Sequence, residues 1–226
     1  MVNLTLPALI LGCAFLLNAS AGLAATGNVP DIGADAAPDH IMLWNGRDLT
    51  GWKLVLRDAA IASADVWDAD GGTLRLHGGA VGYLRTENAW SGYHLHVEWR
   101  WPADANPKSN SGVLVHLHGE DRVWPSCVQL QQKIGSAGQL IGMETELQGF
   151  PVVSGQHRAP LLAPPSENPI GEWNSCDIYA AKDTLEVQVN GVRQNHAENL
   201  PVSSGSIGLQ LEGHPVEFRN LWLRRL

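Results

Sequence analysis

The sequence predicts an all-β protein built as a sandwich of two antiparallel sheets. Hydrophobic and polar residues alternate in many short segments, and Gly, Pro, Asn or Asp bound these segments. No segment keeps a helical period over three turns. The composition agrees, because 24 of the 226 residues are Gly and only 17% are charged, against about 25% in typical globular domains. Many short strands separated by turns are typical of a sandwich.

The first 30 residues carry no charged side chain, and the apolar run 4–17 is followed by small residues. Because this run is too short to span a bilayer, we predict a signal peptide over 1–24 and a linker over 25–39. One domain then covers 40–226. We expect a secreted or periplasmic protein with no transmembrane span. A lipoprotein anchored at Cys13 is the alternative.

Strands are predicted from the alternation in eight segments: 73–77, 93–101, 112–118, 127–132, 176–181, 185–189, 207–211 and 216–223. In 93–101 one face holds only Tyr, Leu, Val and Trp, and the other only His, Glu and Arg. We therefore place Trp99 and Trp101 in the core. Asn190-Gly191 predicts a hairpin turn after 185–189, and the Pro-rich segment 160–169 predicts a loop.

The charge balance and the absence of several motifs exclude some classes of function. A net charge of −8 argues against a nucleic-acid partner, which normally requires a basic surface. There is no Gly-x-Ser-x-Gly elbow, phosphate loop or zincin helix, so a triad hydrolase is disfavoured. A neutral polar ligand is expected, because carboxylates and amides suit hydroxyl groups.

Polar residues occupy one face of four predicted strands, and in a curved sheet this face can line a cleft. The alternative is an ordinary solvated surface. The candidates in chain order are His94, His96, Glu98, His116, His118, Gln129, Gln131, Lys133, Gln210 and Glu212. Trp124 follows a turn and is free to line such a cleft.

Two His-x-His pairs raise the possibility of a divalent metal ion. His94 and His96 could face His116 and His118 on adjacent strands, with Glu98 as a further ligand. The pattern leaves open whether a metal binds and which one.

The cysteines Cys127 and Cys176 remain after removal of the leader. They form either one disulfide or two buried thiols.

The ordered set of motifs resembles the secreted 3-keto-disaccharide hydrolase family, whose members are described as 3-keto-glucoside lyases and hydratases. The matching segments are 43–52 (LWNGRDLTGW), 93–101 (YHLHVEWRW), 110–113 leading to His116, Trp124-Pro125, 166–174, 208–213 and 216–220. Together they cover nearly the whole chain after the linker.

The resemblance implies a concanavalin A-like jelly roll and chemistry on sugars already oxidised at C3. In such a sugar a base removes the proton at C2, the group at C1 leaves, and water then adds. The expected base is His116, with Glu98 as its partner or as a metal ligand. The amides of Asn110 and Gln129, or a divalent cation, would stabilise the enolate.

The chain departs from the family pattern at two positions. Cys127 stands where a Glu is expected, and Gln139 stands where an Asp is expected. Losing both carboxylates could abolish turnover while leaving a sugar cleft. Besides the enzyme, two alternatives therefore remain: a catalytically degenerate, lectin-like carbohydrate-binding module and a structural or adhesion domain of the envelope.

Overall fold

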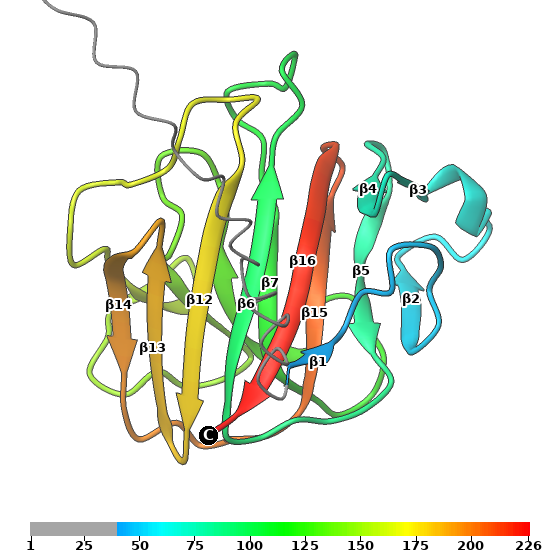
Figure 1. The fold of residues 1–226 in the computed structure, drawn as a ribbon. Helices are drawn as coiled ribbons and strands as arrows, with labels where there is room; N and C mark the ends of the chain where they lie inside the picture. The colour runs from blue at the N-terminus through cyan, green and yellow to red at the C-terminus, as the bar shows by residue number, and fades with distance from the viewer. Residues whose placement is uncertain (1–39) are drawn as a thin grey trace, which may run out of the picture. The chain divides into compact units, whose positions relative to one another are not determined.

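The computed structural model describes residues 40–226, which form two antiparallel sheets (Figure 1). The predicted leader and linker lie outside the described residues. Sheet A contains, in spatial order, β14 (Val192–Ala197), β13 (Thr184–Val189), β12 (Asn174–Ala181), β6 (Tyr93–Arg100), β16 (Val216–Arg225), β4 (Thr73–Leu76) and β3 (Trp67–Asp70), and β1 (Ile41–Met42) also pairs with β16. The predicted all-β architecture is confirmed.

Sheet B lies behind sheet A in Figure 1. It contains, in spatial order, β10 (Val152–Val153), β11 (Gln156–Ala159), β9 (Leu140–Met143), β8 (Ser126–Gln131), β7 (Gly112–His118), β15 (Ser206–Glu212), β5 (Val81–Thr86) and β2 (Trp52–Leu56). One turn of 3-10 helix, η1 (Ser63–Asp65), precedes β3. Among residues 40–226 no helix is long and apolar enough to cross a membrane.

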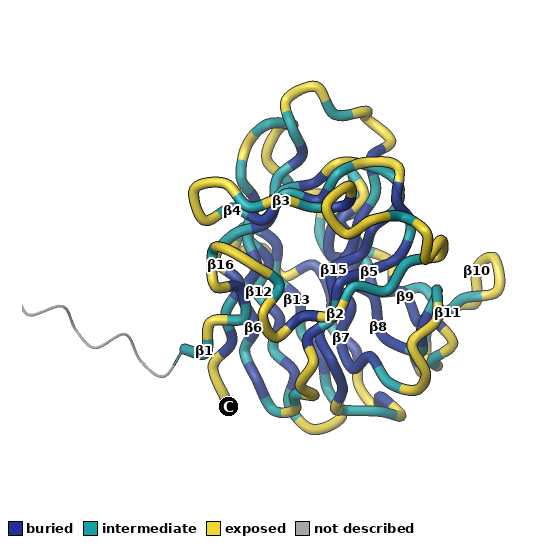
Figure 2. Tube along the Cα trace, turned by 90° about the vertical axis from the view of Figure 1, so that its right-hand side faces the viewer, coloured by how far each residue is buried: buried dark blue, intermediate teal, exposed yellow. Residues whose placement is uncertain are grey.

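The main core lies between the sheets, where the buried stretches of both layers meet (Figure 2). β6 shows why: Val97 and Trp99 are fully buried, whereas His96 and Glu98 between them are partly exposed. Trp101 belongs to the same core, as the alternation predicts.

A second, smaller hydrophobic cluster lies apart from the main core, on strands of sheet B and the loop that follows β7. Its buried members are Tyr83, Leu114, Leu117, Cys127, Ile141 and Met143, and Trp124 packs against them. Several strands of sheet B are consequently buried on both faces. The segments of β5 (VGYLRT) and β9 (LIGM) show no regular alternation of apolar and polar residues, so these two strands were not predicted.

Candidate functional site

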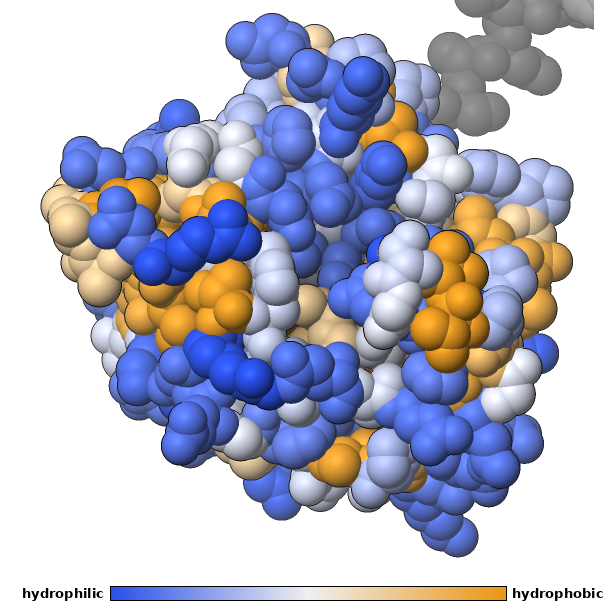
Figure 3. All heavy atoms as spheres, turned by 180° about the vertical axis from the view of Figure 1, so that it is seen from behind, coloured by the Kyte–Doolittle hydropathy of each residue, from blue (hydrophilic) through white to orange (hydrophobic). Residues whose placement is uncertain are grey.

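The outward face of sheet B contains a hollow with a volume of about 220 Å³. Figure 3 shows this side of the molecule hollowed, with hydrophilic side chains around the depression and hydrophobic groups flanking it. Its lining residues come from four strands and two loops: Asn110, Trp124, Gln129, Gln131, Ile141, Met143, Gln156, Arg158, Gln210 and Glu212. Six of the residues proposed from the sequence are therefore brought together here: Asn110, Trp124, Gln129, Gln131, Gln210 and Glu212.

A chain of amides crosses the floor of the hollow. Gln129 Nε2 donates to Gln131 Oε1 at 2.8 Å and to Gln210 Oε1 at 3.0 Å. Gln210 Nε2 in turn donates to Glu212 Oε1 at 3.0 Å. These bonds fix the side chains before any ligand arrives, which reduces the entropy that binding would otherwise cost.

The amide chain depends on a glycine in the strand between its two halves. β7 lies between β8, which carries Gln129, and β15, which carries Gln210. At Gly112 on β7, a Cβ atom would approach Gln129 Cγ and Nε2 to 2.9 Å, which is closer than real Cβ contacts allow. Only glycine therefore leaves room for Gln129 to reach across β7 to Gln210.

Glu212 is the only carboxylate among the described lining residues. Burial raises its pKa above the ordinary value, although Arg57 and His214 act in the opposite direction. A partly desolvated carboxylate with a raised pKa is suited to accepting and returning a proton near neutral pH.

Arg158 on β11 supplies the only cation of the described lining. Its Nη2 donates to Gln156 Oε1 at 2.9 Å, while its Nε is buried without a partner among the described residues. A guanidinium that lines a cavity can donate to an oxygen of a ligand. Arg158 was not predicted from the sequence, because the four-residue strand β11 shows no alternation.

Trp124 reaches the hollow from the loop 119–125, which ion pairs hold on the sheet. Asp121 in this loop accepts hydrogen bonds from Arg85 Nε at 2.6 Å and from Lys53 Nζ at 2.6 Å. The hydrogen bond from Arg85 is the main reason why the pKa of Asp121 falls to about 2. Arg122 in the same loop pairs with Glu144.

Cys127 lies in the cluster beside the hollow, and the structure settles the state of both thiols. Cys127 and Cys176 are free and buried, and Cys176 belongs to the main core instead. Burial raises the pKa of the Cys127 thiol, so this residue stays protonated at neutral pH. It does not replace the ionisable carboxylate expected at this position.

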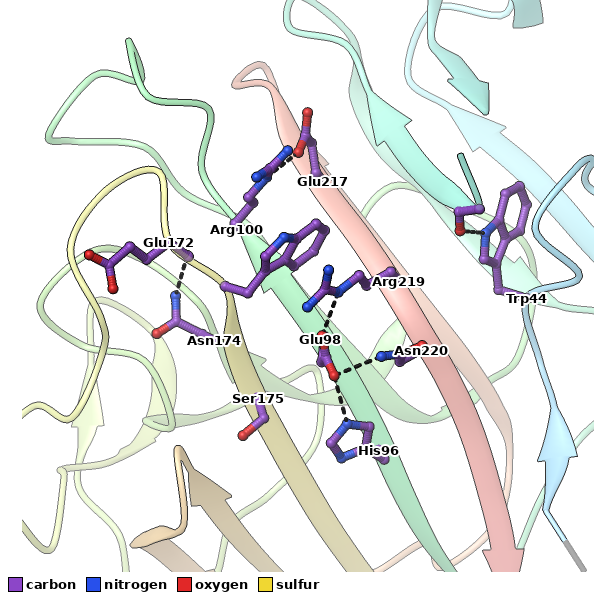
Figure 4. Close-up of polar contacts among 12 residues, drawn as sticks. Trp44, His96, Glu98, Arg100, Glu172, Asn174, Ser175, Glu217, Arg219 and Asn220 are labelled. Atoms are coloured by element: carbon purple, nitrogen blue, oxygen red, sulfur yellow. Dashed lines mark hydrogen bonds and ion pairs between the residues drawn. The ribbon is translucent and has the colours of Figure 1, made fainter. Parts of the chain in front are cut away.

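The expected meeting of Glu98 with His116 and Gln129 in one cleft is wrong. Glu98 projects from β6 on the outward face of sheet A, where it binds Arg219 Nε at 2.6 Å and Asn220 Nδ2 at 2.7 Å (Figure 4). Burial opposes ionisation of Glu98, but these two hydrogen bonds outweigh it and lower its pKa. A carboxylate held in this way is a poor proton acceptor.

His116 is on sheet B, but it does not reach the hollow either. Its side chain is 1% exposed and packs against Tyr93 of β6, a residue of the main core. The register of β7 and β8 shifts between Val115 and His118. This bulge interrupts the strict alternation on which the prediction for His116 depended.

Lys133 and the histidine pairs are also placed differently from the expectation. Lys133 is exposed after the end of β8 and does not line the hollow. His94 and His96 lie on sheet A, whereas His116 and His118 lie on sheet B, so the pairs do not face each other. Among residues 40–226 no group of three or more His, Cys, Asp or Glu side chains is arranged to hold a metal ion.

The fold and the hollow define a β-sandwich in which one sheet carries a polar cavity on its outward face. The chain belongs to the 3-keto-alpha-glucoside-1,2-lyase-like domain family, which matches residues 39–224. This confirms the resemblance drawn from the motifs. No curated protein shows significant sequence similarity to the chain.

Solved structures share the concanavalin A-like jelly-roll fold. A candidate glycosyl hydrolase from Parabacteroides distasonis ATCC 8503 aligns with a TM-score of 0.61 at 18% identity, covering 83% of this chain and 100% of that one. The β-glucanase of Bacillus licheniformis aligns with a TM-score of 0.56 at 13% identity, covering 84% of this chain and 98% of that one. The carbohydrate-binding module CBM66 of Bacillus subtilis aligns with a TM-score of 0.53 at 12% identity, covering 77% of this chain and 95% of that one. At these identities the likeness establishes the fold alone.

Proposed function

We propose that this protein is an enzyme that cleaves 3-keto-glycosides by elimination, followed by hydration, in the hollow of sheet B. The observation that carries the proposal is the placement of Glu212. This partly desolvated carboxylate lines the same small cavity as the guanidinium of Arg158 and a preformed chain of amides. Family membership supports chemistry on keto-sugars.

In the proposed first step the Glu212 carboxylate removes the proton from C2, which the ketone at C3 makes acidic. The electron pair moves toward C3, and the negative charge develops on the ketone oxygen. The guanidinium of Arg158, which lines the hollow, is the proposed donor that stabilises that oxygen. The role of base passes in this proposal from His116 to Glu212, because His116 is buried away from the hollow.

In the second step the C3 ketone re-forms, a double bond forms between C1 and C2, and the bond from C1 to the glycosidic oxygen breaks. The leaving oxygen takes up a proton, for which protonated Glu212 is the proposed donor. Water then adds its hydroxyl to C1 and its hydrogen to C2, so the net reaction is hydrolysis. The scheme needs no oxocarbenium ion.

The size and lining of the hollow fit a single sugar ring. About 220 Å³ is below the range of roughly 300–1,000 Å³ found for drug-sized ligands. Trp124 offers an aromatic face to the apolar side of a pyranose. The side-chain amides of Asn110, Gln129 and Gln131 can donate to and accept from its hydroxyl groups.

A second candidate function is a carbohydrate-binding module without turnover. The specific observation in its favour is the replacement of the expected carboxylate by Cys127, whose thiol stays protonated. The amide chain would serve sugar binding equally well in that case.

The test is incubation of the purified protein with 3-keto-trehalose and other 3-keto-glucosides, with and without a chelator. We expect release of free sugar, and a loss of about 100-fold or more in Glu212→Gln with binding retained. The matched control is Glu120→Gln, because Glu120 is exposed and does not line the hollow. Saturable binding without release by the unmodified protein would support the second candidate instead. If the protein neither releases sugar from these compounds nor binds them, both candidate functions are wrong.

A further inference from the structure

A second cavity lies at the end of the sandwich where β6 ends and β12 begins, the upper end in Figure 1. Its volume is about 360 Å³, larger than that of the hollow. Its walls come from the turn after β8 and from the loop before β12, the segment that contains the sequence SENP. We call it the end cavity, and none of the proposed elimination chemistry uses it.

The walls of the end cavity are fixed to each other by the carboxylate of Glu167. Glu167 Oε1 accepts hydrogen bonds from the backbone N–H groups of Gly135 and Ala137, both at 2.9 Å. The neighbouring Asn168 donates its backbone N–H to Asn174 Oδ1 at 2.7 Å. Both walls are therefore tied to the sheets, and the cavity is formed before any ligand binds.

The lining combines an apolar surface with acceptors that the protein leaves free. Trp101, Ile134 and Ile170 supply the apolar part. Among the described residues no hydrogen bond uses Glu167 Oε2, and Asn168 uses only its N–H groups, which leaves its Oδ1 available. The described lining contains no cation. A matching ligand carries no negative charge, has one apolar face and donates hydrogen bonds from its edge.

We propose that the end cavity is a second carbohydrate-binding site that holds one pyranose ring. A pyranose has the required shape, because its C–H face packs against apolar side chains such as Ile134 and Ile170 while its hydroxyls donate to carboxylate and amide oxygens. Trp101 is 4% exposed and borders the cavity with only a small part of its ring. The inference extends the proposed function in taking sugar as the ligand, but it requires neither a keto group nor turnover.

The two sites flank one short turn. Gln131 lines the hollow and Ile134 lines the end cavity. Three residues of extended chain span at most about 11 Å. Lys133 is exposed between them and lines neither site.

The test uses trehalose, which has no keto group, and protein labelled with 5-fluorotryptophan. The fluorine resonances, assigned with Trp→Phe variants, report the end cavity through Trp101 and the hollow through Trp124. We expect trehalose to shift the Trp101 resonance saturably. In Glu167→Gln, which keeps an oxygen for the two backbone N–H groups, we expect affinity to fall roughly tenfold or more.

A filling variant and its control make the result specific. Ile170→Trp should occupy the cavity and abolish the shift at Trp101. Leu162→Trp should not, because Leu162 is exposed in the same loop but lies outside the lining. Melting curves establish that both variants fold. The absence of a shift at Trp101 in the unmodified protein, or a shift that survives Ile170→Trp, would overturn the proposal. Failure of the proposed function has a different signature, which is no release of sugar from 3-keto-glucosides.

Discussion

His116 places its imidazole edge-on against the ring of Tyr93, with the ring centroids 6.3 Å apart and the planes at 69°. Both residues are almost completely buried. Neither ring nitrogen of His116 makes a well-formed hydrogen bond among residues 40–226, and the backbone of Val202 only weakly favours the charged form against the effect of burial. The surroundings therefore favour the neutral imidazole, and burial lowers the pKa of His116 to about 4.

This burial predicts that acid destabilises the protein through His116. The pKa of His116 is lower in the folded state than its ordinary value of 6.5. Folding therefore costs nothing through His116 above pH 6.5, where the imidazole is neutral in both states. The free energy of unfolding decreases as the pH falls from 6.5 toward 4, because the unfolded state then binds the proton first. The loss should amount to about 3 kcal/mol, since each pKa unit corresponds to about 1.36 kcal/mol. Urea unfolding curves measured between pH 7 and pH 4 give this quantity.

The matched variant is His116→Asn. The backbone of His116 has a φ of +53°, and Asn tolerates this left-handed region better than most residues. Since Asn does not titrate, the variant should show a flatter dependence of stability on pH over the same interval. Equal slopes in the two proteins would contradict the assignment.

Glu98 is expected to contribute to stability and not to turnover. In Glu98→Gln the hydrogen bonds to Arg219 and Asn220 lose their charge, but the outward face of sheet A keeps its shape. Arg219 is 41% exposed, so we expect a loss of only about 1 kcal/mol in the free energy of unfolding. Sugar release should stay within about twofold. A collapse of activity with intact binding would instead show that Glu98 takes part in catalysis.

The alternation of residues predicted the strands of sheet A well, because one of its faces meets the core and the other meets solvent. β6 is the clearest case, with buried and partly exposed residues in strict order. Sheet B was harder to predict, because strands such as Leu140–Met143 are buried on both faces. Such strands can be predicted only from the length of the apolar segment and from the turn residues at its ends. A strand of four residues is too short for its length to be informative.

Asp121 is expected to act as a positioning residue for Trp124. Its carboxylate joins the loop 119–125 to Arg85 and Lys53. In Asp121→Asn the loop loses this charged anchor, while Arg85, whose side chain is 19% exposed, loses its partner. We expect KM for the keto-glycoside to rise severalfold with kcat nearly unchanged, and stability to fall by about 1–3 kcal/mol. Steady-state kinetics separate these effects. An equal loss in kcat and kcat/KM would mean that Asp121 acts in the chemical step.

The candidate site was predictable only where the alternation holds. Gln129 and Gln210 lie on regular stretches of β8 and β15, and they share one face as expected. His116 does not, because the bulge in β7 interrupts the alternation. The strand also packs closely there: a Cβ at Gly205 would lie 2.5 Å from the carbonyl carbon of His116. Such close approaches arise from tertiary packing and leave no local signal in the sequence.

Restoring a carboxylate at position 127 is expected to destabilise the protein rather than to improve it. Cys127 is fully buried, and its Sγ lies 3.8 Å from Met143 Sδ within an apolar cluster that includes Tyr83 and Leu114. A Glu at this position would have no cationic partner in that cluster, so burial would raise its pKa well above the ordinary value. In Cys127→Glu we expect a loss of about 4 kcal/mol or more at pH 7.

Cys127→Gln separates the charge from the size of the new side chain, since Gln has the same shape as Glu without the carboxylate. An acid whose pKa is raised by folding costs stability only above its unfolded pKa of about 4.3. The difference between the two variants in urea unfolding should therefore be largest at pH 7 and should vanish below about pH 4. A difference that does not change with pH would show that the glutamate finds a partner and remains charged. In that case the cluster beside the hollow accepts the carboxylate that the family pattern places at this position.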